Sequence, residues 1–150
     1  MLIATRPTEL PGLVGEPLGA TDWLEIDQAR VDAFAENTED RQWIHVDPAR
    51  AATSPFGGPI AHGFLSLSLL SHFLEQLLEV GGSRMLVNYG LDRVRFPAPV
   101  PVGSRLRGVG SLAAVTEVPG GYQLVLDITV EIEGATKPAC VAAFVVRVLS

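Results

Sequence analysis

The clearest pattern along the chain is the alternation of apolar and mostly polar residues in YQLVLDITVEIEG, residues 122–134. Apolar side chains at every second position place one face of an extended segment in a core and leave the other face outside. This pattern predicts a long, half-buried antiparallel strand. Further strands are predicted over residues 84–96, 104–118 and 138–149, with turns at 119–121 and 133–137.

A second pattern covers IAHGFLSLSLLSHFLEQLLEV, residues 60–80, in which apolar residues occupy most of the circumference of a helix. We expect this long helix to be buried on nearly every side. Pro59 should set its first turn, and Gly81 with Gly82 should supply a left-handed cap at its end. Ser66 and Ser68 are small enough to let such a helix pack closely against a sheet.

Two short helices are expected before this long one. The first has Asp27 as its N-cap and ends near Thr38, and the second opens at Asp47-Pro48. Residues 1–20 contain three prolines and four leucines without a clear period, so we expect them to form a surface leader.

The order of elements predicts an α+β fold, in which a strongly curved antiparallel sheet wraps round the long helix. That architecture is the hot-dog fold. A chain of 150 residues suffices for one core, so we expect a single domain over residues 1–150.

The composition of the chain argues against some kinds of binding partner and some cellular locations. The formal net charge is −6 and only 11 residues are Lys or Arg, which argues against a nucleic-acid partner. Neither a signal peptide nor an apolar run long enough to cross a membrane is recognisable. The single cysteine, Cys140, cannot form an internal disulfide and is expected to be a small buried hydrophobe. A cytoplasmic location fits these features.

TEDRQWIHVDP, residues 38–48, carries the candidate chemistry, because Asp40 and His45 could hold one water molecule between them. In a continuous helix, residues five apart point about 140° away from each other, so the pair converges only if the chain bends. The expected link between the two short helices provides that bend. An isolated pair of this kind would more often be caps or surface groups. His62 could line the same site or satisfy backbone groups in the first turn of the long helix.

The segments 34–70 and 94–107 (FAENTEDRQWIHVDPARAATSPFGGPIAHGFLSLSLL and VRFPAPVPVGSRLR) resemble the MaoC-like, R-specific enoyl-CoA hydratase family, in particular a short single-hot-dog branch from actinobacteria. The resemblance implies addition of water to a trans-2-enoyl-CoA to give the (R)-3-hydroxyacyl-CoA, by a homodimer and without a cofactor. It also implies that Asp40 and His45 are catalytic, that the backbone N–H of Gly63 binds the oxyanion and that Ser71 bonds the catalytic Asp. Gly63 also suits that role because it lies in the first helical turn, where N–H groups lack intrahelical partners.

The chain departs from the family pattern at three positions, where many members have Gly, Asn and Pro and this sequence has Glu39, Gln42 and Trp43. The spacing from Asp40 to His45 is unchanged. The direction of the Trp43 side chain is not predictable from the sequence.

Other functions remain open at this level. A hot-dog thioesterase would direct water at the carbonyl carbon and release free thiol, whereas a non-catalytic acyl-CoA-binding or partner subunit would use the pair only structurally. The three histidines lack a standard zinc spacing and no Gly-x-Gly-x-x-Gly motif follows a strand, so neither a metal nor a nucleotide cofactor is expected. The phosphates of an acyl-CoA substrate could be bound by arginines, the candidates being Arg84, Arg93, Arg95, Arg105 and Arg107.

Overall fold

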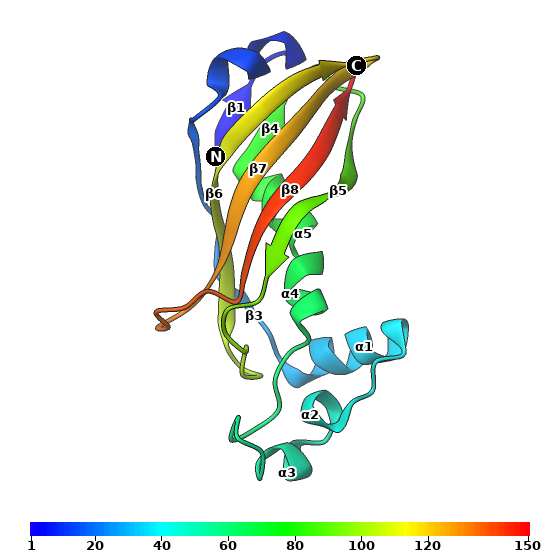
Figure 1. The fold of residues 1–150 in the computed structure, drawn as a ribbon, viewed down its shortest axis with the longest axis vertical. Coiled ribbons are helices and arrows are strands. Elements are labelled where there is room, and N and C mark those ends of the chain that lie inside the picture. Colours follow the sequence, from blue (N-terminus) through cyan, green and yellow to red (C-terminus); the bar gives the residue numbers. More distant parts are fainter.

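The computed structural model describes residues 1–150 and contains one large, curved antiparallel sheet (Figure 1). Its strand order is β2-β6-β7-β8-β5, and β3 pairs with β6 beside β2. The strands are β2 (Pro17–Ala20), β3 (Leu24–Glu25), β5 (Met85–Arg95), β6 (Arg105–Val118), β7 (Gly121–Ile132) and β8 (Cys140–Leu149). The four long strands and the two turns expected from the sequence are therefore confirmed.

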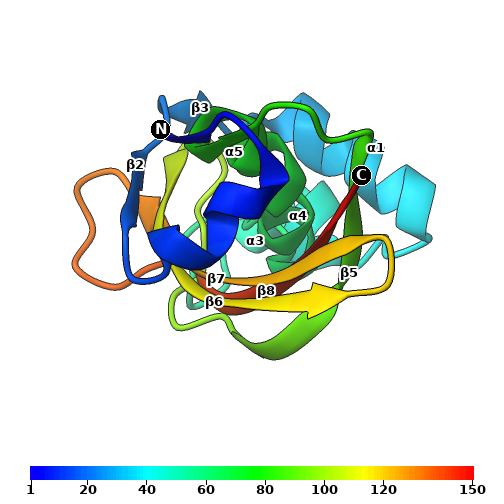
Figure 2. The ribbon, with the colours of Figure 1, turned by 90° about the horizontal axis from the view of Figure 1, so that it is seen from above.

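The alternate apolar side chains of β7 face the core, as expected. Leu124, Leu126, Ile128, Val130 and Ile132 are buried. The sheet curves round the helices that follow the candidate site in the chain, which is the predicted hot-dog arrangement (Figure 2). One cluster of 28 buried apolar residues joins the sheet, these helices and the N-terminal segment.

The long helix is shorter than expected and is divided. It consists of α4 (Gly63–Ser68) and α5 (Leu70–Leu77), separated by Leu69, whose backbone stays in the right-handed helical region. The N–H groups of Leu69 and Phe73 still bond to the carbonyls four residues earlier, so the two helices follow one another closely.

Both ends of that helix differ from the prediction. Residues 60–62 are not helical, and Ile60 instead forms an isolated bridge with Pro101. At the other end the chain becomes strand β4 (Leu78–Val80), so Gly82, at φ 70°, turns the chain after a strand and caps no helix. Short leucine-rich runs satisfy helical and extended patterns equally well, which is why β4 was missed.

The expectation of a surface leader is wrong in that the first 20 residues form regular elements and three of them, Ala4, Leu10 and Leu18, are buried in the core. β1 (Leu2–Ala4) pairs in parallel with β4, a 3-10 helix η1 follows (Pro7–Leu13), and β2 pairs with β6. Leu10 and Leu18 are fully buried. A 3-10 turn and a four-residue strand are too short and irregular to give a period that the sequence reveals.

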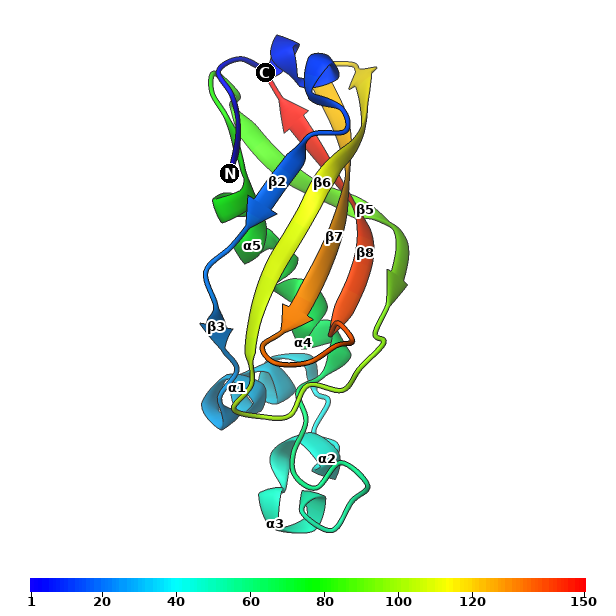
Figure 3. The same cartoon turned by 90° about the vertical axis from the view of Figure 1, so that its left-hand side faces the viewer.

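The segment that carries the candidate site forms three helices, α1 (Gln28–Thr38), α2 (Trp43–Val46) and α3 (Pro48–Ala51). The Asp27 side chain accepts from Arg30 N–H and the Asp47 side chain accepts from Arg50 N–H, so both predicted caps are confirmed. The three helices gather at one end of the molecule, beyond the ends of the strands (Figures 1 and 3).

No helix in the structure combines the length and the apolar character needed to cross a bilayer. Cys140 is free and fully buried on β8, as expected. Burial raises the pKa of the Cys140 thiol to about 11, which removes the thiolate that reactive cysteines need.

Candidate active site

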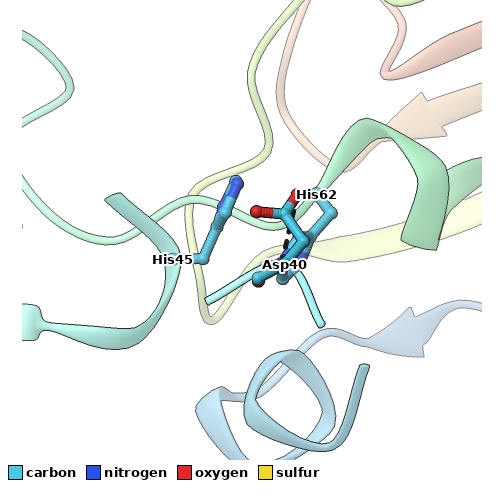
Figure 4. Close-up of side chains that lie close together, drawn as sticks. All are labelled: Asp40, His45 and His62. Atoms are coloured by element: carbon cyan, nitrogen blue, oxygen red, sulfur yellow. Dashed lines mark hydrogen bonds and ion pairs between the residues drawn. The ribbon is translucent and has the colours of Figure 1, made fainter. Parts of the chain in front are cut away.

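Asp40 and His45 meet at the bend between α1 and α2. α1 ends at Thr38, and Glu39 then adopts a left-handed conformation with φ 62°, which turns the chain back. A ring nitrogen of His45, a ring nitrogen of His62 and a carboxylate oxygen of Asp40 all lie within 4.8 Å of one another (Figure 4). The predicted convergence is therefore present, with the added feature that His45 belongs to the short helix α2.

The orientation of His45 is fixed by a backbone carbonyl. Its Nδ1 lies 2.6 Å from the carbonyl oxygen of Ile60. Because a carbonyl only accepts, Nδ1 carries the proton and donates, and the neutral ring keeps its lone pair on Nε2. A second bond, from Ile60 N–H to the carbonyl of Ile44 at 3.0 Å, fixes the two segments together. Ile60 thus presents His45 as a proton acceptor.

His45 is only 6% exposed, and burial is the largest cause that lowers its pKa below the ordinary value. The neighbouring His62 lowers the pKa further, while the Ile60 carbonyl and the Asp40 carboxylate act in the opposite direction. The net effect favours a neutral His45 at physiological pH.

His62 belongs to the site, and it satisfies no backbone group in the first turn of α4. Its Nε2 lies 2.9 Å from the backbone carbonyl of Asp40, to which it donates, and 4.0 Å from Asp40 Oδ2. Its ring stacks on the ring of His45 and also contacts Phe34, with centroids 3.8 Å and 4.9 Å apart respectively. His62 therefore holds the backbone of Asp40 and the ring of His45 at the same time. The bond that reveals this spans 22 residues, so no local sequence signal could have found it.

A cavity of about 260 Å³ opens next to His45. Gly63, the first residue of α4, lines it and has no carbonyl one turn earlier to which its N–H could bond. A Cβ at this position would lie 2.8 Å from the Phe96 ring, so a side chain would clash. The lining residues are His45, Phe56, Ile60, Ala61, Gly63, Ser66, Phe96, Ala98, Pro99, Val100 and Ala139.

Ser71 lies apart from this group. Its Oγ accepts a hydrogen bond of 2.8 Å from Asn88 Nδ2, and it lines a different cavity between α5 and β5. The expected bond to Asp40 is not formed within the single chain.

Trp43, whose direction the sequence left open, is the first residue of α2 and stacks under the guanidinium of Arg50, 4.3 Å from the ring centroid. This contact joins α2 to α3. Trp43 therefore stabilises the helices beside the site and does not line the cavity.

The arginines considered for phosphate binding separate into two groups. Arg105 pairs with Glu133 and Arg107 with Glu131, so their charges are already partnered. Arg84, Arg93 and Arg95 have no carboxylate partner, and the last two lie on β5, which leads directly to Phe96 at the cavity.

The spacing of Asp40 and His45 suits a bound water molecule. Two hydrogen bonds of about 2.8 Å from one water span up to roughly 5.6 Å between their partners, more than the 4.8 Å that encloses this cluster. The same three side chains are also the one group of histidine, cysteine and acidic residues close enough together to ligate a metal ion. Because one nitrogen of each histidine is occupied by a carbonyl, only the other nitrogen could serve.

Comparison with known proteins identifies the family of the chain. A family model described as "MaoC like domain" matches residues 9–126. The chain belongs to the MaoC-like family. It is 51% identical over 140 residues to 3-hydroxyacyl-thioester dehydratase Z of Mycobacterium tuberculosis, covering 93% of each chain. It is 46% identical over 141 residues to nodulation protein N of Rhizobium leguminosarum, covering 91% of this chain and 87% of that protein.

Solved structures support the same assignment. The structure of the (R)-hydratase from Aeromonas caviae, described as involved in PHA biosynthesis, superposes with a TM-score of 0.73 at 32% identity. It covers 89% of this chain and 94% of the hydratase. The chain is thus a hot-dog member of the MaoC-like dehydratase and hydratase family.

Proposed function

We propose that this MaoC-like protein is a hydro-lyase that interconverts a trans-2-enoyl-CoA and the corresponding (R)-3-hydroxyacyl-CoA. The observation that carries the proposal is the orientation of His45, whose Nδ1 is held by the Ile60 carbonyl, in a cluster with the Asp40 carboxylate beside a mainly apolar cavity. The relative named as a 3-hydroxyacyl-thioester dehydratase supports the reaction, and the one named as an (R)-hydratase supports its stereochemistry.

In hydration, Asp40 and His45 hold the water molecule. The water oxygen bonds to C3, one water proton passes to the pair, and the π electrons of the C2–C3 bond move onto the thioester to give an enolate. A proton from the same pair then reaches C2, so both additions take place on one face of the substrate. A neutral His45 can accept the first proton at physiological pH. Since the two groups are adjacent, the proton is assigned to the pair as a whole.

The developing negative charge on the thioester oxygen needs a donor, and we assign the N–H of Gly63. This group starts α4 and lines the same cavity as His45. Loss of one such donor typically costs about 3 to 4 kcal/mol of transition-state stabilisation. We also propose that no metal or other cofactor takes part, so turnover should survive treatment with EDTA.

A homodimer is part of the proposal. β5 is an edge strand of the sheet, and an unpaired edge is a template for pairing with a second chain. Its exposed apolar side chains are Met85, Leu86, Val87, Tyr89 and Leu91. Ser71 bonds to Asn88, which lies on this edge strand. The hydrogen bond from Ser71 to the catalytic Asp that the resemblance implies would therefore form next to the dimer contact.

The function is tested with purified protein and crotonyl-CoA. Hydration removes the absorbance of the conjugated enoyl group without releasing thiol, whereas a thioesterase would release free coenzyme A. Asp40→Asn and His45→Gln should each lower kcat by at least about 100-fold. Asp127→Asn and His72→Gln, which change exposed residues outside the site, serve as matched controls. Folded variants that retain full turnover would overturn the site, and absence of activity with enoyl-CoA of every chain length would overturn the enzyme.

A further inference from the structure

The hydroxyl of Ser66 is buried and lacks a hydrogen-bond partner. Ser66 is 1% exposed, and its Oγ is one of two buried side-chain polar atoms without a partner. The nearby serines differ, since Ser68 donates to the Phe64 carbonyl and Ser71 accepts from Asn88. Small size explains a close helix–sheet contact, but alanine would provide that equally well. An unpaired buried hydroxyl is costly, so a partner that arrives with a ligand is the expected explanation.

Ser66 lies beside the candidate active site. Ser66 lines the cavity that His45 and Gly63 also line. Ser66 and His45 are the only lining residues whose side chains can form hydrogen bonds, because the others are apolar, proline or glycine. A molecule in this cavity would therefore meet His45, the Gly63 N–H and the Ser66 hydroxyl as its polar contacts.

Helix geometry places Ser66 on the side of the cavity where Gly63 lies. The two residues are three positions apart in α4, and residues at this spacing are neighbours on one helix face. Helical side chains also lean towards the N-terminus, which directs the Ser66 hydroxyl back over the turn that begins at Gly63.

We propose that the Ser66 hydroxyl is a second donor to the thioester oxygen, acting beside the N–H of Gly63. This inference rests on the proposed function and adds a side chain to the oxyanion site. The hydroxyl bonds the carbonyl oxygen in the bound substrate, and the bond strengthens as negative charge develops on that oxygen.

The first test compares Ser66→Ala with Ser68→Ala, a matched change in the same helix at an exposed hydroxyl. Ser66→Ala should lower kcat for crotonyl-CoA roughly 10- to 100-fold, with a smaller change in KM, while Ser68→Ala should not change kcat. Because the Ser66 hydroxyl bonds to no other protein group, Tm should change little. An unchanged kcat, or a fall in Tm that accounts for the lost activity, would show that Ser66 is a packing residue.

A second test measures hydrogen bonding to the thioester carbonyl oxygen without turnover. trans-Cinnamoyl-CoA is bound to Asp40→Asn, in which polarisation of its carbonyl shifts its absorption to longer wavelength. Adding Ser66→Ala should reduce that shift, and adding Ser68→Ala should not. An undiminished shift would overturn the assignment of Ser66, whatever the activity. If the wild type fails to hydrate any enoyl-CoA but the shift depends on Ser66, the hydratase proposal fails and the oxyanion contact stands.

Discussion

The imidazole rings of His45 and His62 stack with centroids 3.8 Å apart and planes inclined by 24°. Each ring also uses one nitrogen as a donor to a backbone carbonyl, His45 to Ile60 and His62 to Asp40. A positive charge on one ring opposes a positive charge on the other, and both rings are buried. The stack therefore opposes protonation of His45, the ring that faces the proposed water, and fixes its position.

The lowered pKa of His45 predicts how activity depends on pH. The neutral form that accepts a proton persists below pH 6.5, the ordinary histidine value, because burial disfavours the charged form. We expect kcat/KM for crotonyl-CoA to stay constant as pH falls through 6.5 and to decrease only in more acidic buffer. A pH–rate profile measures this, and a midpoint at or above 6.5 would contradict it.

The same shift predicts how stability depends on pH. Below pH 6.5 the unfolded chain takes up a proton at His45 that the folded protein resists, so the free energy of unfolding decreases as pH falls. The contribution is fully present above pH 6.5 and is lost as pH falls through the lower folded-state pKa. Urea unfolding at several pH values should show this slope in the wild type and a smaller slope in His45→Gln.

His62 should act as a positioning residue. His62→Phe keeps an aromatic ring against Phe34 and His45 but removes the donor to the Asp40 carbonyl. We expect kcat to fall roughly 3- to 10-fold with little change in KM, the loss expected for one neutral hydrogen bond. His62→Gln restores a donor and should recover part of kcat. Full activity in His62→Phe would show that Asp40 needs no such support.

Glu39 has a left-handed backbone, which costs a non-glycine residue about 1 kcal/mol or more. Its carboxylate pairs with Arg41, but the pair is exposed and such pairs contribute about 0 to 1 kcal/mol. Glu39→Gly should therefore raise the free energy of unfolding by up to about 1 kcal/mol. Urea unfolding checks this, with Glu36→Gly in α1 as a variant that should destabilise. A loss of stability in Glu39→Gly would mean that the ion pair outweighs the strain.

The N-terminal segment should contribute to global stability. Leu18→Ala removes a fully buried side chain from β2 and should cost about 2 to 5 kcal/mol. Val14→Ala changes a side chain that is half exposed and should have little effect. Chemical denaturation of the two variants measures the change in the free energy of unfolding. A decrease below about 1 kcal/mol for Leu18→Ala would indicate a loosely attached segment.

The parts of the fold that the sequence predicted correctly are those marked by a local pattern of residues. Strict alternation identified β7, and Asp27 and Asp47 marked two helix starts through their capping side chains. The parts that were missed depend on distant contacts. β1 and β4 exist only because they pair with each other, and Leu10 is buried by neighbours that no local pattern names.

The residues of the candidate site also differ in how far the sequence predicted their roles. The family resemblance implied roles for Asp40, His45 and Gly63, and local chemistry was compatible with them, because the spacing of the pair requires only a bend and a first-turn N–H is free. The role of His62 was left open and Ser66 was assigned only to close packing, because the contacts that distinguish them are one hydrogen bond across 22 residues and one missing hydrogen bond.

The three short helices that hold Asp40 and His45 lie at one end of the molecule, beyond the sheet (Figure 3). Long-range hydrogen bonds tie them to the chain before α4, among them Ile60 to Ile44 and His62 to Asp40. Segments with few such ties open at a lower free energy than the whole domain. In the proposed function, activity therefore depends on these few long-range bonds as well as on the folded sheet.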